Sequence, residues 1–246
     1  MRRAVIFFFV LMLALRAFAA EAFHYITPAL LQIPPERLDP GTIQDPQWGG
    51  LRYVLFDSDA DLLSTGSTST GRQIFVFDLQ QRDIDGSLAL TQVTTALLDD
   101  NRRPTTGHHA VTIAYDAKIG GVGPRQLMLI DRYTGTRTQL TNGASDSTST
   151  NASVDDGERV VVFESAADFF AKGVGGTQIY RIDLRKALLG CPFPCPGNAG
   201  LSQITAKVGT NRNAVTGTGG KSIVFESDAL NGGQTQNQIY LYNSKT

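Results

Sequence analysis

An internal repeat constrains the fold of this chain more than any single motif, because a fixed period means that one structural unit is used several times. Four segments of thirteen residues align without gaps, and each ends in an aromatic residue that an acidic residue follows. The segments are residues 44–56, 103–115, 151–163 and 213–225, and the acidic residues are Asp57, Asp116, Glu164 and Glu226. Glycine or histidine stands six positions before each aromatic, at Gly50, His109, Gly157 and Gly219. We predict a strand, a tight turn and a strand in each segment, with a positive φ at that glycine or histidine.

Two further blocks follow these segments. Short runs of β-branched and aromatic residues, typical of strands, occupy residues 73–78, 126–131, 178–183 and 238–243. A block of Thr or Ser, Gln, an aliphatic residue and Thr occurs three times, at residues 91–94, 138–141 and 202–205, so the fourth repeat is incomplete. Four strands per repeat, without a convincing amphipathic helix, predict an all-β chain that forms a β-propeller of four-stranded blades. The repeats span approximately residues 44–100, 101–148, 149–210 and 211–246.

The third repeat carries a family resemblance. Residues 154–165 contain an Asp-Asp-Gly turn followed by the strand Val-Val-Val-Phe-Glu-Ser, and the two further blocks come after them. This order resembles the repeat of TolB-type β-propellers, and the stretch 56–62, Phe-Asp-Ser-Asp-Ala-Asp-Leu, is similar to a variant in exported bacterial proteins of unassigned function. The resemblance covers residues 44–246 and implies the fold, but it implies no particular activity. The second repeat departs from the family pattern at residues 107–109, Gly-His-His, where we expect an irregular hairpin.

The N-terminus has the pattern of an export signal. Arg2 and Arg3 precede the apolar run 4–15, and residues 17–20 supply an A-x-A cleavage site. We predict that residues 1–19 are a signal peptide, with cleavage after Ala22 as the second choice. A membrane anchor is the alternative, but the run is shorter than the roughly 20 residues that cross a bilayer. The expectation is a periplasmic or secreted protein with no membrane span after cleavage.

A proline-rich loop holds the two cysteines, Cys191 and Cys195. Disulfides persist in exported proteins, and we predict one between these residues. Half of a zinc site is the alternative, but structural zinc takes four ligands and the three histidines, His24, His108 and His109, are distant in the sequence.

Closure of the propeller is a separate question, since TolB-type propellers commonly have six or seven blades. This sequence holds three complete repeats and most of a fourth. Within the N-terminal segment 20–43, residues 23–33 could supply the strand missing after Asn243 and close a four-bladed ring, although the prolines restrict them to an edge strand. The alternatives are a truncated product and a partial array that closes against another chain, because an open array exposes faces and edges.

One group of acidic residues has the spacing of a metal site. Asp57, Asp59 and Asp61 place three carboxylates at alternating positions, as calcium loops do. Leu62 and Thr68 stand where such a loop has glycine and a bidentate glutamate. We favour the alternative that these acids cap the turn at the end of a strand. We therefore expect no cofactor, with calcium as the cation that the triplet would take.

Motifs for catalysis or for nucleic-acid binding are lacking. There is no G-x-S-x-G sequence, and the histidines have no recognisable Ser and Asp partners. We therefore assign no catalytic residue, although acids from different blades could meet at one face, as in glycosidases. The sequence has 22 Lys and Arg residues against 23 Asp and Glu, without the basic excess that nucleic-acid binding needs.

Small polar residues of the innermost strands form the candidate binding site. The candidates that would line the channel are Arg103, Thr105, Asn151, Ser153, Asn213 and Thr216. Such groups suit a polar ligand or a peptide, and the alternative is polarity at a solvated channel. The predicted function is a non-catalytic, exported binding or scaffold module for an envelope or secreted protein or a small polar ligand. The alternative is a hydrolase acting on glycans or peptides, or the propeller remnant of a larger hydrolase.

Overall fold

The computed structural model of the chain describes residues 43–49, 52–63, 71–82, 88–96, 98–142, 148–188, 200–229 and 237–244. The predicted signal peptide, the segment 20–42, and Cys191 and Cys195 with their predicted disulfide lie outside these residues.

The described residues form four antiparallel sheets, and each sheet uses strands that are consecutive in the sequence. The first sheet contains β1 (Ile43–Gly49), β2 (Tyr53–Ser58), β3 (Gln73–Arg82) and β4 (Leu88–Gln92), and the second contains β5 (Asp100–Thr106), β6 (Thr112–Lys118), β7 (Gln126–Asp131) and β8 (Arg137–Gln139). The third contains β9 (Ser149–Val154), β10 (Val160–Ser165), β11 (Gln178–Asp183) and β12 (Leu201–Gln203), and the fourth contains β13 (Asn211–Thr216), β14 (Ser222–Ser227) and β15 (Gln238–Asn243). A single turn of helix, α2 (Leu184–Leu188), follows β11. The predicted all-β fold of four-stranded blades, with an incomplete fourth, is confirmed.

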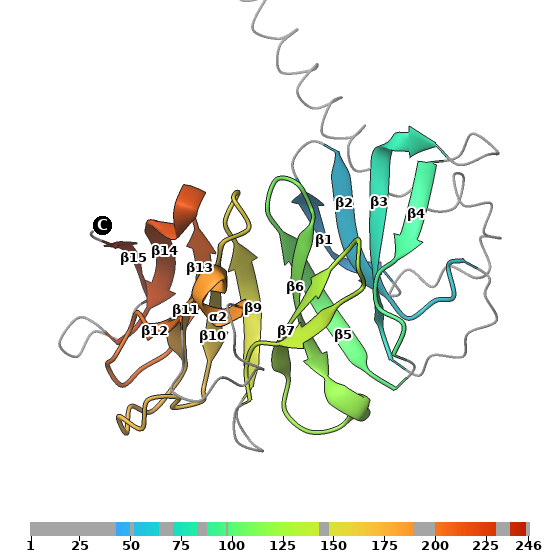
Figure 1. Cartoon of the computed structure of the whole chain (residues 1–246). Helices are drawn as coiled ribbons and strands as arrows, with labels where there is room; N and C mark the ends of the chain where they lie inside the picture. The colour runs from blue at the N-terminus through green and yellow to red at the C-terminus, as the bar shows by residue number, and fades with distance from the viewer. Residues whose placement is uncertain are drawn as a thin grey trace, which may run out of the picture.

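The sheets stand side by side, with the first and the fourth at opposite ends of the array (Figure 1). Consecutive sheets contact each other, and the first strands β1, β5, β9 and β13 are neighbours in that order. We call these four the inner strands, and we call β4, β8 and β12 the outer strands. The described sheets form an open array, and closure by the segment 20–43 concerns residues outside the description.

The second strands of the first three sheets explain why the sequence shows apolar runs rather than strict alternation. All residues of β2 and β10 are buried, and β6 is buried except at its two ends. Both faces of these sheets pack against other residues, so successive side chains on both sides are apolar.

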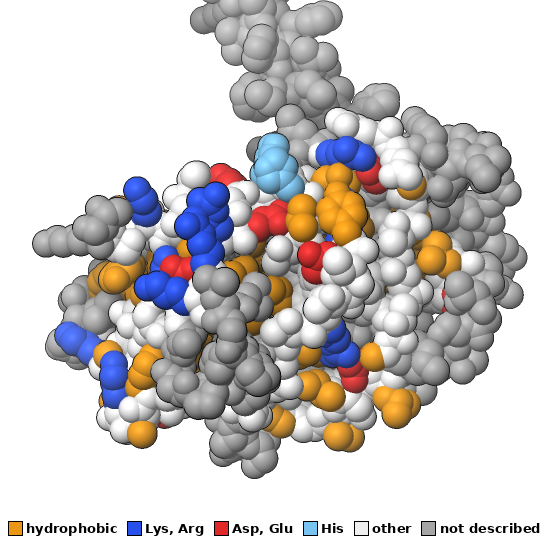
Figure 2. All heavy atoms as spheres, viewed as in Figure 1, with side chains coloured by type: hydrophobic (Ala, Val, Ile, Leu, Met, Phe, Trp, Pro, Cys, Tyr) orange, Lys and Arg blue, Asp and Glu red, His pale blue; other side chains and the backbone are white. Residues whose placement is uncertain are grey.

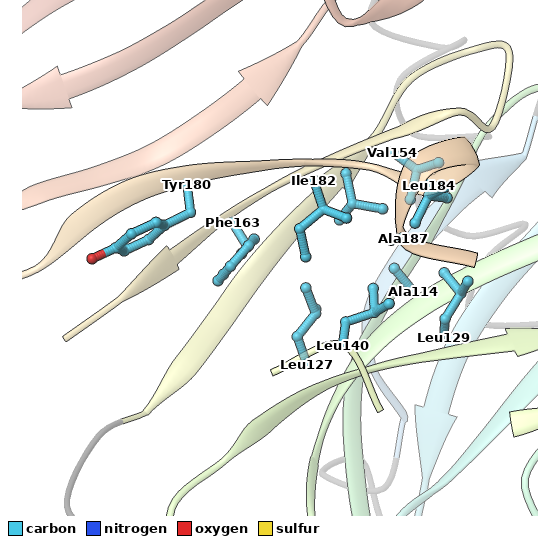
Figure 3. Packing of buried hydrophobic residues seen from close by; sticks show 11 residues of the cluster. Ala114, Leu127, Leu129, Leu140, Val154, Phe163, Tyr180, Ile182, Leu184 and Ala187 are labelled. Carbon is cyan, nitrogen blue, oxygen red and sulfur yellow. The ribbon is translucent and has the colours of Figure 1, made fainter. Parts of the chain in front are cut away.

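The cluster between the second and third sheets shows this packing (Figure 3). Leu127 of β7 lies near Ile182 of β11 in this view, and Leu129 of β7 lies near Leu184 of α2 in the same cluster. Burying each side chain of this size contributes roughly 1.5–3 kcal/mol. Packing between sheets therefore stabilises the array.

A stacked aromatic pair crosses the second and third strands in three of the four sheets. The ring centroids are 5.6 Å apart in Phe56–Phe75, 5.6 Å apart in Phe163–Tyr180 and 5.7 Å apart in Phe225–Tyr240. In the second sheet the same position pairs Tyr115 with Met128. These pairs are the structural basis of the aromatic residue that ends each aligned segment.

The hairpin turns differ from the prediction in two sheets. Gly219 has the expected positive φ, 71°, whereas the positive φ falls on Ala110 (49°) and Glu158 (53°) in the second and third sheets. The prediction for His109 and Gly157 was therefore wrong by one residue, and Gly50 lies outside the described residues.

Local hydrogen bonds explain the shift in the third sheet. The backbone oxygen of Asp155 accepts the N–H of Glu158 at 2.9 Å. Its side chain accepts the N–H groups of Arg159 and Val160, both at 2.7 Å. This turn, formed by an aspartate, places the left-handed residue directly before Arg159.

Glu158 also explains how the irregular hairpin of the second sheet is held. Its carboxylate accepts the backbone N–H groups of His109 and Val111 at 3.2 Å and of Thr112 at 2.7 Å. The third sheet thus supplies hydrogen bonds to a turn whose own sequence lacks the usual Asp-Gly pair.

Candidate binding site on the inner strands

Each of the last three inner strands has a non-glycine residue in the left-handed region. Arg103, Asn151 and Asn213 have φ of 51°, 50° and 54°, and the strand pairing shifts register at each of them. A left-handed conformation costs a non-glycine residue roughly 1–3 kcal/mol, so surrounding contacts must hold it. Bulges of this kind re-aim the backbone and side chain of the bulged residue.

Carboxylates from neighbouring sheets accept hydrogen bonds from the backbone N–H groups of two of these left-handed residues. Oδ1 of Asp57, in the first sheet, accepts the backbone N–H of Arg103 in the second sheet at 3.2 Å. The carboxylate of Glu164, in the third sheet, accepts the backbone N–H of Asn213 in the fourth. Two of the four acids that follow the aligned segments, Asp57 and Glu164, therefore join one sheet to the next.

The side chains of the same left-handed residues bind the acid of their own sheet. Arg103 donates to Asp116 through Nε at 2.7 Å and through Nη2 at 3.1 Å. Asn151 and Asn213 donate through Nδ2 to the carboxylates of Glu164 and Glu226, each at 3.0 Å. The bulge, its side chain and the two acids form one repeated polar unit. Sequence analysis aligned these residues but missed their role, and the available signal was an Asn, which tolerates a left-handed φ, at two equivalent positions.

The position in the array sets the electrostatics of two of these acids. Burial raises the pKa of Glu164 above its usual range, although Asn213 and Asn151 donate hydrogen bonds to it. The pKa of Glu226 is lowered, first by the hydrogen bond from the Asn213 side chain and also by Arg212. The pKa of a glutamate is thus raised at the covered junction between two sheets and lowered at the open end of the array.

A pocket of about 370 Å³ lies across three inner strands. Its lining residues are Arg103, Pro104 and Thr105 of β5, Asn151, Ala152 and Ser153 of β9, and Asn213, Ala214 and Val215 of β13. Five of the six candidate channel residues are among them, and Thr216 lies beside them, donating its backbone N–H to Oγ of Ser153 at 3.1 Å. Ligand contact at these six residues stays a prediction.

The aspartate triplet of the first sheet has a basic neighbour. Asp57 is buried and pairs with Arg72, whose Nη1 lies 3.7 Å from Oδ2 of the half-exposed Asp59. Arg72 therefore supplies positive charge beside two members of the triplet, and Asp61 is partly buried nearby in the sequence. Calcium binding by Asp57, Asp59 and Asp61 stays a prediction.

The serine that follows the acid caps the turn at the end of the second strand in three sheets. Oγ of Ser58 accepts the backbone N–H of Ala60 at 3.1 Å. The equivalent Ser165 and Ser227 accept the N–H groups of residues 167 and 229, each at 3.0 Å. These side-chain caps are local to each turn, whereas the carboxylates of Asp57 and Glu164 bind the neighbouring sheet.

No group of three or more His, Cys, Asp and Glu residues suited to a metal ion is found within the described ranges. His108 and His109 are exposed on the second hairpin, with their rings edge to face at 5.1 Å. His24 lies outside the described residues. Acidic and basic side chains are interspersed over the visible face (Figure 2).

A second repeated unit fixes the outer strands; the sequence shows its residues as repeated blocks but not the hydrogen bonds between them. In each complete sheet a threonine hydroxyl after the outer strand accepts a backbone N–H from the third strand and donates to a glutamine side chain there. In the first sheet, Thr94 accepts from Ile74 at 2.8 Å and donates to Gln73 at 2.8 Å. In the second, Thr141 accepts from Leu127 at 2.8 Å and donates to Gln126 at 2.9 Å. In the third, Thr205 accepts from Ile179 at 2.9 Å and donates to Gln178 at 2.8 Å. We call this unit the Gln–Thr clasp.

Comparison with known proteins addresses the fold. No family model matches the sequence, and no curated protein matches it. The structure of TolB from Acinetobacter baumannii superposes with a TM-score of 0.53 at 18% identity, over 82% of this chain and 41% of that one. The fold is TolB-like. This chain therefore spans less than half the length of that TolB structure.

Enzymes that contain propellers also resemble this TolB-like chain. A prolyl endopeptidase structure has a TM-score of 0.54 at 11% identity, over 95% of this chain and 33% of that one. An oligogalacturonate lyase in complex with manganese has a TM-score of 0.50 at 12% identity, over 78% and 46%. Identities this low show the fold alone. In the described part of the chain, no helix is long and apolar enough to cross a membrane.

Proposed function

We propose that this chain is a non-catalytic, exported binding module that recognises another envelope or secreted protein through the pocket on its inner strands. The observation that carries the proposal is the convergence of polar side chains from three sheets on one pocket of about 370 Å³. Pockets that orient a ligand combine an apolar lining with a few placed polar groups, and this pocket has both.

The rigidity of the lining supports binding. Arg103 and Asn213 have their backbones held by carboxylates of the preceding sheet and their side chains held by carboxylates of their own. A site fixed before the ligand arrives loses less conformational entropy on binding. The partly buried side chains of Arg103, Asn151 and Ser153 carry hydrogen-bonding groups of the kind that recognise the amide groups of a polypeptide.

The absence of a catalytic role is inferred from how the charged groups are used. Asp116 and Glu164 accept side-chain hydrogen bonds at the pocket, and Arg103 forms the ion pair with Asp116. Paired in this way, these groups serve as structural supports for the bulges rather than as an acid and a base.

The location rests on the sequence and on the fold. Residues 1–19 have the order of a secretory signal, and the fold is that of TolB. We infer an envelope or secreted location, which detection of the mature N-terminus by mass spectrometry of fractionated cells would test.

The binding proposal is tested by filling the pocket. Thr105 lines it, and the half-buried Thr138 of the outer strand β8 provides a matched site in the same sheet. Affinity capture from the envelope fraction with the full chain should enrich a specific protein. Thr105→Trp should lose that protein, while Thr138→Trp should retain it.

Two results would contradict the proposal. Retention of the same protein by Thr105→Trp would place the contact elsewhere. Turnover of a peptide or glycan by the wild-type chain, abolished by Thr105→Trp, would assign the pocket to a hydrolase.

A further inference from the structure

A second pocket, of about 360 Å³, lies where the first sheet meets the second. Its charged lining residues are Asp59, Arg72, Asp100, Arg102 and Lys118. It shares no lining residue with the pocket on the inner strands. We call it the charged pocket, and the proposed function makes no use of it.

The two sheets are joined closely beside the charged pocket. The carbonyl oxygen of Arg72 accepts the backbone N–H of Asn101 at 2.9 Å and Nδ2 of the same residue at 3.1 Å. Gly71 lies so near the start of β5 that a Cβ there would be 2.3 Å from the carbonyl oxygen of Asp99. The Asp99 carboxylate accepts the N–H of Gly120 at 2.6 Å, which fixes the turn after β6. Walls held in this way lose little conformational entropy when a ligand binds.

The second sheet gives its side of the pocket an excess of positive charge. Arg102, Arg103 and Arg125 form one network of ion pairs with Asp100 and Asp116, so three cations share two carboxylates. Burial by itself raises the pKa of Asp100, but Arg102 and Arg125 outweigh burial and the pKa is lowered. Lys118 adds a further cation to this side.

The first sheet gives its side of the pocket an excess of negative charge. Arg72 binds the buried carboxylate of Asp57, and its Nη1 lies 3.7 Å from Oδ2 of Asp59. One cation thus stands beside two carboxylates. The Asp59 side chain is 50% exposed, and its distance from Arg72 is longer than a hydrogen bond. Asp59 therefore keeps hydrogen-bonding capacity for a ligand.

Asp59 and Lys118 line the same pocket from different sheets but do not pair with each other. Among the described residues, the ion pairs do not include Lys118. An ammonium group carries three donors and a carboxylate carries only acceptors. The charged pocket therefore offers an acceptor on one side and donors on the other.

We propose that the charged pocket binds a small zwitterion that carries one carboxylate and one ammonium group, as a free amino acid or a short peptide does. The carboxylate of the ligand binds Lys118 and Arg102, and its ammonium group binds Asp59. Hydrogen bonds between ionised partners are the strong ones, and arginine matches the geometry of a carboxylate. A volume of about 360 Å³ is within the range of small-molecule pockets.

Ligands with a single kind of charge fit this pocket less well. Asp59 repels an anion, and Lys118 with Arg102 repels a cation. A zwitterion places a charge of the right sign beside each side, so neither repulsion arises. The opposite charges of the two sides thus select the ligand class.

Calorimetric titration of the full chain with alanylalanine tests the proposal. We expect saturable binding with one site per chain. N-acetyl-alanylalanine lacks the ammonium group and alanylalanine amide lacks the carboxylate, so each should bind roughly tenfold more weakly. Free alanine distinguishes the two sources of the ligand: tighter binding than alanylalanine assigns the pocket to amino acids, and weaker binding assigns it to peptides.

Matched variants connect each charge of the ligand to one side of the pocket. Asp59→Asn should weaken alanylalanine roughly tenfold and should not weaken the acetylated peptide further. Lys118→Met should weaken alanylalanine similarly and should not weaken the amide further. Lys207→Met, at an exposed lysine outside the lining, should leave every affinity unchanged.

Four results would overturn the proposal. Equal binding of the parent, acetylated and amidated peptides would mean that the charges are not recognised. Tighter binding of succinate than of alanylalanine would assign the pocket to anions. Failure of both alanine and alanylalanine to bind would contradict the site itself. Loss of binding in Thr105→Trp, which fills the other pocket, would place the ligand on the inner strands; retention is the expected result and is independent of the proposed function.

Discussion

The carboxylate of Glu164 accepts the backbone N–H of Asn213 across the junction between the third and fourth sheets. Asn213 is left-handed, and its side chain binds Glu226 in its own sheet. One residue therefore connects two acids that occupy equivalent positions in successive repeats, one covered and one at the open end of the array.

Glu164→Gln should stabilise the chain above the acidic range. Burial raises the pKa of Glu164, so the folded state binds its proton more tightly than the unfolded state does. The free energy of unfolding then falls as pH rises from the unfolded pKa, about 4.3, through the raised folded pKa. Glutamine keeps an oxygen for Asn213 but carries no charge. Urea denaturation should show that the free energy of unfolding of the variant increases relative to that of the wild type as pH rises to 7. A relative decrease across that range would contradict the account.

Glu226→Gln should have the opposite dependence on pH. Hydrogen bonds from Asn213 and Arg212 lower the pKa of Glu226, so its contribution to stability is present above the unfolded pKa. That contribution disappears as pH falls through the folded pKa. The variant should be less stable than the wild type at pH 7 and equal to it at low pH. Titration of the two carboxyl groups by NMR should give Glu226 a lower pKa than Glu164, and the reverse order would be inconsistent with the structure.

Thr205→Val should destabilise the third sheet by roughly 1–3 kcal/mol, because it leaves the buried N–H of Ile179 and the side chain of Gln178 without the hydroxyl. Thr205→Ser keeps the hydroxyl and should recover most of the loss. Chemical denaturation measures both variants, and Thr138→Val provides a control on an outer strand. An unchanged free energy of unfolding in Thr205→Val, or a loss in Thr205→Ser as large as in Thr205→Val, would contradict this role of the hydroxyl.

A lysine should be tolerated at Ile239 but not at Ile179. Ile239 is 78% exposed, so Ile239→Lys should change the free energy of unfolding by no more than about 0.5 kcal/mol. Ile179 occupies the equivalent position and is fully buried, so Ile179→Lys should cost roughly 4 kcal/mol or more. Similar losses at the two positions, measured by thermal unfolding, would mean that the edge of β15 is covered in solution.

The repeats predicted the strands closely because each aligned segment combines composition with period. The runs at residues 126–131, 178–183 and 238–243 coincide with β7, β11 and β15. The aromatic that ends each segment becomes a partner of the third strand, as in Phe225 with Tyr240. A buried strand needs both faces apolar, and such a run is visible in the sequence without any knowledge of its neighbours.

The site was harder to predict, because its chemistry depends on contacts between sheets. Asp57 binds Arg72 and the backbone N–H of Arg103 in the next sheet, and the sequence around Asp57 shows neither contact. The turn at residue 158 shifted because Asp155 closes it from within. The sequence pattern shows which residue types occupy equivalent positions. The hydrogen bonds between repeats depend on the bulges at Arg103 and Asn213, which the pattern does not show.

Photocrosslinking in living cells tests the central claim, that the inner-strand pocket binds a protein, most directly. Val215 lines the pocket and is 60% exposed, and Val122, 74% exposed, lies in the loop between β6 and β7 and is not among the lining residues. A benzoylphenylalanine at position 215 of the full chain should crosslink to one envelope or secreted protein, and the same group at position 122 should not. Absence of a crosslink at position 215, or an identical pattern at both positions, would contradict the account.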